Sequence, residues 1–188
     1  MILIVDNHDS FTYNILDTIK KISTQEIISI KSSTLDIEQI EPFDKIILSP
    51  GPMLPSDYPI LFQILKKYQN TKSILGICLG HQAICQFYGA ELYNLQEVKH
   101  GYPSQIKCDP SSILFKGISS TTVGRYHSWA AKNIPKNTLK ITASTEDGCI
   151  MGVEHPSKNI FGIQFHPESY ISSDGATILK NFIDATNK

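Results

Sequence analysis

The sequence predicts an α/β fold with an open, mostly parallel twisted sheet, flanking helices and a small antiparallel piece. In the first half, short apolar runs alternate with helical segments, which is the pattern of parallel strands covered on both faces. After about Ala90 the segments become shorter and strand-like, separated by Gly, Pro, Asn and Ser, which favours antiparallel additions. At 188 residues we expect a single domain spanning residues 1–188.

The first half supplies four predicted strands, at residues 1–6, 26–31, 44–49 and 73–77. The first helix is expected from Ser10 to Ile22, and Asp9 or Ser10 can cap its first turn. A second helix is expected to begin within Pro55 to Pro59, because apolar residues then recur at helical spacing. This alternation predicts a doubly wound sheet.

The second half supplies five strand-like segments, at residues 91–98, 104–108, 139–144, 150–155 and 160–165. Ser173 and Asp174 are suited to cap a last helix. In that helix Ile178, Leu179, Phe182 and Ile183 fall on one face, so the helix is expected to pack against the sheet.

Composition restricts the classes of partner. A net charge of −1 offers no electrostatic footprint for nucleic acid or an acidic membrane. The start, MILIVDNHDS, lacks the basic region of a signal peptide, and no run approaches the ~18 apolar residues of a membrane span. We therefore expect a cytoplasmic protein without a nucleic-acid or membrane partner. The four cysteines show no CxxC pair and no metal-ligand spacing, so free thiols and no metal site are expected: Cys78, Cys85, Cys108 and Cys149.

The segment Gly76-Ile-Cys78-Leu-Gly80 joins a predicted strand to a predicted helix. Two glycines remove the Cβ atoms that would obstruct a strained turn, so the side chain between them is exposed, as in a nucleophile elbow. A thiol at a helix N-terminus also has its thiolate favoured by unpaired N–H groups. The alternative is a small-residue turn with a buried structural cysteine.

A cysteine nucleophile needs a base and a group that orients the base. His166-Pro167-Glu168 offers both, because proline keeps the preceding residue extended and residues i and i+2 then face the same side. The Cα atoms would lie ~6–7 Å apart, close enough for the carboxylate to bind one imidazole nitrogen. The alternative is a surface turn with a solvated histidine and glutamate.

An acyl-transfer site also needs fixed donors for an oxyanion. Leu79 follows the cysteine and opens the predicted helix, so its backbone N–H is one candidate. In Ser49-Pro50-Gly51-Pro52, Gly51 alone between two prolines keeps its N–H. Both segments end predicted strands at the edge where open α/β sheets bind ligands. A plain strand-terminating turn is the alternative for 49–52.

Several motifs occur together and in order: DNHDSFTYN (6–14), SPGP (49–52), GICLGHQ (76–82), HG (100–101), HS (127–128) and GIQFHPES (162–169). The chain thereby resembles the class I (triad) glutamine amidotransferases, whose fold is flavodoxin-like. The opening DNHDSFTYN makes it similar in particular to the glutaminase subunits of anthranilate synthase and aminodeoxychorismate synthase.

The resemblance implies a role for each matching residue. Cys78 would attack the amide of L-glutamine and form a glutamyl thioester, His166 would be the base, and Glu168 would orient it. The oxyanion hole would be formed by the backbone of Gly51 and Leu79. The substrate-binding residues would be Pro50, Gly51, Pro52, Leu79, Gln82, Ser128 and Trp129. The resemblance implies no cofactor or metal in this chain, with Mg²⁺ expected only in the partner synthase.

The implied function is release of ammonia for a chorismate-using synthase. That synthase would be anthranilate synthase in tryptophan biosynthesis, with aminodeoxychorismate synthase in folate biosynthesis, or both, as the alternative. Four positions depart from the family pattern: Met53, Tyr102, Trp129 and Glu154. Met53 and Trp129 would border the glutamine pocket, whereas Tyr102 and Glu154 lie in segments that face the synthase in the family.

Two other classes of function stay open from the sequence. The departures are compatible with a non-catalytic regulatory partner that keeps the fold. A flavodoxin-like nucleotide-binding module would need a phosphate-binding loop after the first strand, whereas DNHDSFTYN is acidic and has no glycine.

Overall fold

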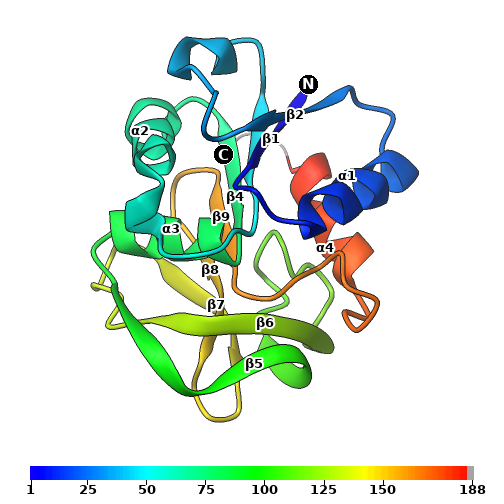
Figure 1. Cartoon of the computed structure of the whole chain (residues 1–188). Coiled ribbons are helices and arrows are strands. Elements are labelled where there is room, and N and C mark those ends of the chain that lie inside the picture. Colours follow the sequence, from blue (N-terminus) through cyan, green and yellow to red (C-terminus); the bar gives the residue numbers. More distant parts are fainter. Residues whose placement is uncertain (186–188) are drawn as a thin grey trace.

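A sheet of nine strands runs through the computed structural model, which describes residues 1–185 (Figure 1). The strand order is β2-β1-β3-β4-β9-β8-β7-β5-β6. The strands are β1 (Ile2–Asp6), β2 (Ile27–Lys31), β3 (Lys45–Leu48), β4 (Ser73–Ile77), β5 (Glu91–Cys108), β6 (Ser120–Lys132), β7 (Lys140–Thr145), β8 (Ile150–Glu154) and β9 (Ile160–Ile163). The helices are α1 (Phe11–Ile22), α2 (Pro59–Tyr68), α3 (Leu79–Phe87) and α4 (Gly175–Asp184). Short 3₁₀ turns occupy Ile37–Ile40 and Pro55–Asp57.

The strands β2, β1, β3, β4 and β9 are mutually parallel, and β8, β7, β5 and β6 continue the sheet in antiparallel pairs. The predicted fold class is therefore confirmed. The parallel register places Val5 beside Leu48, and Leu48 beside Gly76, so the loops after β1, β3 and β4 leave the same edge of the sheet.

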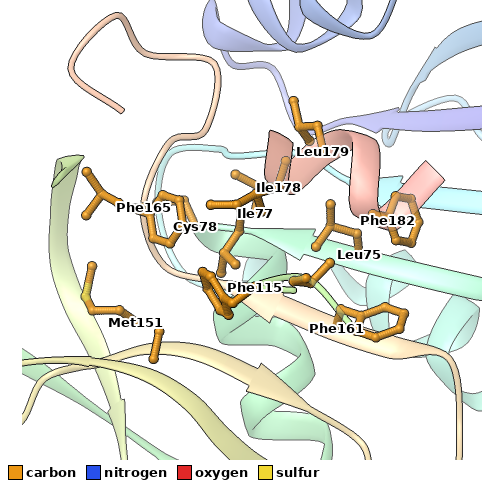
Figure 2. Close-up of a cluster of buried hydrophobic side chains, with 14 of the residues drawn as sticks. Leu75, Ile77, Cys78, Phe115, Met151, Phe161, Phe165, Ile178, Leu179 and Phe182 are labelled. Carbon is orange, nitrogen blue, oxygen red and sulfur yellow. The ribbon is translucent and has the colours of Figure 1, made fainter. Parts of the chain in front are cut away.

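Each face of the parallel sheet carries its own hydrophobic cluster, because alternate strand residues point to opposite faces. Helices α1 and α4 cover one face side by side, while α2 and α3 cover the other (Figure 1). Figure 2 shows part of the first cluster, in which Phe161 and Phe182 pack edge to face at 6.0 Å between ring centroids. Cys78 belongs to this cluster. None of the helices within residues 1–185 is long and apolar enough to cross a membrane.

The antiparallel half differs from the prediction in two strands. The segments 91–98 and 104–108 form one strand, β5, and β6 was not predicted at all. Gly101 and Pro103 suggested a break, but the strand continues: Gly101 falls in a register shift between His100 and Tyr102, and Pro103 pairs with Gly124. In β6, the buried side chains include polar Arg125 and His127, so the apolar alternation that marks a strand is lost.

The helices begin near the predicted residues, but some of the predicted capping contacts differ. Asp9 caps α1, since its Oδ1 accepts a hydrogen bond from Phe11 N at 2.8 Å, while the Ser10 side chain makes no cap bond. A separate 3₁₀ turn precedes α2, which begins at Pro59. Asp174 occupies the cap position of α4 without a side-chain cap bond.

Candidate active site

Cys78 lies between the last residue of β4 and the first residue of α3, with φ 52° and ψ −101°. A non-glycine residue held at such angles is strained, and strain of this kind is typical of functional turns. The flanking glycines are required by contact: a Cβ on Gly76 would overlap the backbone of Gly80, and a Cβ on Gly80 would overlap the Leu48 carbonyl. The predicted strained turn is therefore present, but Cys78 is only 6% exposed rather than open to solvent.

The base and its partner come from the loop that follows β9. His166 Nδ1 and Glu168 Oε1 lie 2.6 Å apart, with only 2% and 0% of the two side chains exposed. The rings of Phe11 and Tyr126 pack against the His166 ring, at 4.7 and 5.0 Å between centroids. His166-Pro167-Glu168 thus presents both groups together, as predicted.

The electrostatics of His166 favour a charged ring. Burial opposes the charge, but hydrogen bonding and charge from Cys78 and Glu168 outweigh burial and raise the pKa of His166. Since Glu168 is bonded to Nδ1, Nε2 is the nitrogen left for the Cys78 thiol, and within residues 1–185 it has no hydrogen-bond partner. An imidazole whose charged form is favoured is suited to take up the proton of a neighbouring thiol.

The loop after β3 carries the second candidate oxyanion donor, Gly51. A Cβ on Gly51 would lie 2.6 Å from Leu79 Cδ2 and 2.7 Å from Asn7 Cβ, so only glycine fits against the elbow. Asn7 holds this loop: its N–H donates to Ser49 Oγ and its Nδ2 donates to the Ser49 carbonyl, both at 2.9 Å. Gly51 is thereby held against the side chain of Leu79, the residue that carries the other candidate donor.

A cavity of about 200 Å³ opens beside Cys78. Its size suits a small ligand rather than a cofactor. It is lined by Gly51, Pro52, Met53, Cys78, Leu79, Gln82, Val98, Lys99, His100, Tyr126, His127, Ser128 and Trp129. Every predicted substrate-binding residue except Pro50 is in this lining. Pro50 is buried behind it, where its carbonyl accepts a hydrogen bond from Ser49 Oγ at 2.7 Å.

A hydrogen-bonded network fixes the far wall of the cavity. The sequence did not predict the part played by three of its members, Arg125, His127 and Gln164. Arg125 Nε donates to His127 Nε2 at 3.0 Å, and His127 Nδ1 contacts the Trp129 carbonyl at 2.8 Å. Because Arg125 can only donate, His127 must carry its proton on Nδ1. Burial, and then the charge of Arg125, lower the pKa of His127 to about 4, so this ring is neutral.

The same carbonyl accepts from Gln82 Nε2 at 2.9 Å, and Gln82 Nε2 also contacts Gln164 Oε1 at 3.2 Å. Gln164 Nε2 in turn lies 3.7 Å from Cys78 Sγ. The signal for Gln164 was its place in GIQFHPES, and His127 stands in the HS motif, but neither position predicts these contacts. Arg125 left no sequence signal.

The geometry thus combines an elbow thiol, a buried imidazole–carboxylate pair and a small polar cavity. Residues 3–185 match the protein family described as glutamine amidotransferase class-I. This chain belongs to that family. Among curated relatives of the amidotransferase, a Haemophilus influenzae protein carrying the name anthranilate synthase component II is 41% identical over 97% of this chain and 95% of its own.

One further relative agrees with this assignment, and a solved structure shares the fold. The aminodeoxychorismate/anthranilate synthase component 2 of Bacillus subtilis is 36% identical to the amidotransferase, over 100% of this chain and 98% of its own. The crystal structure of a GMP synthase subunit from Thermoplasma acidophilum superposes with a TM-score of 0.86 at 24% identity. That match covers 97% of this chain and 91% of the other, and at this identity it supports the fold alone.

The four departures from the family pattern occupy different environments in the amidotransferase. Met53 and Trp129 line the cavity, as predicted. Tyr102 is 49% exposed, with Lys99 Nζ 4.3 Å above its ring. Glu154 is 9% exposed, and its Oε2 accepts a hydrogen bond from Ile113 N at 3.1 Å, so its side chain is held within this chain. That its segment faces a synthase stays a prediction.

The four cysteines of the amidotransferase are free and buried. Burial raises the pKa of the Cys108 thiol to about 11, which suits a core residue. Within residues 1–185, no group of three or more His, Cys, Asp or Glu is placed to hold a metal ion.

Proposed function

We propose that this amidotransferase is the glutaminase subunit of a chorismate-using synthase, with Cys78, His166 and Glu168 as its catalytic triad. The observation that carries the proposal is the elbow thiol at a small cavity, next to a histidine paired with a buried carboxylate. Together these groups supply the nucleophile, base and orienting group of acyl transfer.

In the proposed reaction, Cys78 sulfur forms a bond to the amide carbon of glutamine after its proton has passed to His166. The carbonyl π electrons move to oxygen, and the oxyanion accepts from the N–H groups of Gly51 and Leu79. Collapse breaks the C–N bond, and His166 returns the proton to the leaving ammonia. Water then cleaves the glutamyl thioester through a second oxyanion, giving glutamate and the free thiol.

The substrate would lie along the cavity walls. Gln82, Pro52 and the backbone of Ser128 and Trp129 would hold the amino-acid end, while Pro50 and Gly51 shape the oxyanion loop. Every group in this sequence is a protein side chain or backbone amide, so the chemistry calls for no cofactor or metal in this chain. Mg²⁺ is assigned to the partner synthase.

The partner is proposed from the names of the relatives, which are components of anthranilate or aminodeoxychorismate synthases. Ammonia released into water at neutral pH is protonated and ceases to be a nucleophile, so a synthase subunit must receive it directly. Anthranilate synthase is the first candidate, and the Bacillus subtilis name supports one subunit serving both synthases. The proposed location is the cytoplasm, which keeps four free thiols reduced.

The test uses the complex with the synthase. Cys78→Ser should abolish glutamine-dependent product formation and leave ammonia-dependent formation intact, because the synthase uses ammonia directly. Loss of both activities would mean that Cys78 has a structural role. A glutamine-mimicking electrophile that fails to label wild-type Cys78 would favour the second candidate, a regulatory subunit without catalysis, to which the departures at Met53 and Trp129 point.

A further inference from the structure

Gln164 is a completely buried amide beside the nucleophile, and the triad mechanism does not use it. In the parallel ladder Ile77 of β4 pairs with Ile163 of β9, so Cys78 and Gln164 are the next pair at the carboxyl edge. The backbone holds them there, since Cys78 N donates to the Ile163 carbonyl at 2.9 Å and Gln164 N donates to the Met151 carbonyl at 3.0 Å. Gln164 Nε2 then lies 3.7 Å from Cys78 Sγ.

The direction of this contact is set by groups that can only accept. The Trp129 carbonyl has no proton, so Gln82 must turn its amino group toward it. The second proton on Gln82 Nε2 points to Gln164, which therefore presents its Oε1. The amino group of Gln164 is left to face the sulfur. His127, held by Arg125, donates to the same Trp129 carbonyl and so fixes the first acceptor in this series of hydrogen bonds.

We propose that Gln164 is a further catalytic residue, which donates an N–H to the Cys78 thiolate and is oriented for this by Gln82 and the Trp129 carbonyl. A donor stabilises the charged form of its partner, whereas an amide turned the other way would place an oxygen against the sulfur and oppose the charge. Gln164 keeps its own protons throughout; the thiol proton still passes to His166. The inference rests on the proposed role of Cys78 as nucleophile.

Other charged and titratable groups line the cavity beside Cys78 or contact His127 and His166, and a test must leave them in place. They come from β5, β6 and the loop after β9: Lys99, His100, Arg125, His127, His166 and Glu168.

The experiment follows alkylation of Cys78 by iodoacetamide as a function of pH, with the modified peptide quantified by mass spectrometry. Gln164→Met replaces the amide with an apolar side chain of similar length and so removes the N–H donor. We expect the rising limb of its profile to move about one pH unit upward, so that alkylation on that limb is about tenfold slower. The matched control is Gln86→Met, an exposed position on α3, which should give the wild-type profile. Superimposable profiles for Gln164→Met and wild type would overturn the inference.

Two more variants keep the test decisive. If Gln164→Met does not fold, as judged by circular dichroism, Gln164→Asn keeps an amide that is too short to reach the sulfur, and it should show the same displacement. Gln82→Met removes the group that orients Gln164, so a smaller displacement in the same direction is expected. An unchanged profile for Gln82→Met would contradict the proposed orientation.

The alkylation assay needs neither glutamine nor the synthase, so it is independent of the test of the proposed function. If Cys78→Ser keeps glutamine-dependent product formation, the proposed function fails. If that variant behaves as expected and Gln164→Met alkylates with the wild-type profile, only the role of Gln164 fails.

Discussion

Two buried histidines near the cavity have opposite protonation preferences. The pKa of His166 is raised by Cys78 and Glu168 in spite of burial, whereas burial and Arg125 lower the pKa of His127 to about 4. The difference follows from their partners: one ring faces a carboxylate and a thiol, and the other accepts from a guanidinium. Groups whose pKa values are driven apart in this way mark the division between proton transfer and positioning.

The lowered pKa of His127 predicts a loss of stability in mild acid. The folded protein keeps His127 neutral down to about pH 4, while the unfolded chain binds a proton below about pH 6.5. Stability is therefore fully present above pH 6.5 and falls as the pH drops toward 4, by about 1.4 kcal/mol per pH unit. His81, whose pKa burial lowers to about 3, adds a similar slope.

Urea unfolding at a series of pH values measures this slope. His127→Gln retains an acceptor for Arg125 and a donor for Trp129 without a titrating group, so its stability should fall less steeply between pH 6.5 and 4. His100→Gln, at an exposed position, is the control and should keep the wild-type slope. Equal slopes for wild type and His127→Gln would show that His127 is not the responsible group.

The glycines that flank Cys78 also give a prediction for the stability of the fold. A Cβ on Gly80 would overlap the Leu48 carbonyl, which is backbone and cannot move aside. We expect Gly80→Ala to lower the free energy of unfolding by about 2–4 kcal/mol in denaturant titration. The control is Gly117→Ala: its φ of 77° carries strain but nothing lies within 4 Å of the added Cβ, so about 1 kcal/mol is expected. A smaller loss for Gly80→Ala than for Gly117→Ala would contradict the contact argument.

Between elements, the loops after β1 and β3 are fastened together by Asn7 and Ser49. This contact explains part of the motif DNHDSFTYN: Asn7 supports the loop that carries Gly51, and Phe11 packs on His166. The loop after β3 therefore depends on a segment more than 40 residues away, since Asn7 and Ser49 are 42 positions apart.

Ser49→Ala should loosen this loop. It removes the acceptor for Asn7 N and the donor to the Pro50 carbonyl. Each such hydrogen bond contributes about 1 kcal/mol, so we expect glutamine-dependent kcat in the complex to fall about tenfold with little change in KM. Ammonia-dependent product formation should be unaffected, and Ser56→Ala, an exposed serine in the neighbouring 3₁₀ turn, should behave as wild type. An unchanged kcat would show that the hydrogen bonds of Ser49 do not contribute to catalysis.

The elements that the sequence predicted well are those with local signals. Apolar runs marked β1, β3 and β4, and the glycines around Cys78 marked the elbow, because each pattern reflects the burial or backbone geometry of its own segment. Strand β6 was missed because its buried residues are partly polar, and their burial is compensated by partners on other elements. Gln164 was missed for the same reason: its contacts with Gln82 and Cys78 span more than 80 positions.

At the scale of the whole molecule, the cavity opens toward a surface that carries exposed apolar side chains. Met53 and Val98 line the cavity and are 73% and 64% exposed, and Tyr102 is 49% exposed nearby on β5. Under the proposed function this is where a synthase would dock, because ammonia must leave the cavity without meeting bulk water.

Tyr102 tests that arrangement without touching the cavity, since it is not among the lining residues. Tyr102→Ser removes an exposed aromatic ring that also packs under Lys99, and exposed aromatics are frequent anchors of interfaces. We expect the synthase concentration needed for half-maximal glutamine-dependent activity to rise about tenfold, which corresponds to about 1.4 kcal/mol, while the rate at saturating synthase stays near wild type. Ile141→Ser changes an apolar residue of matching exposure, 48%, on β7 and should leave the synthase dependence unchanged. Equal effects of the two variants would show that Tyr102 is not part of the docking surface.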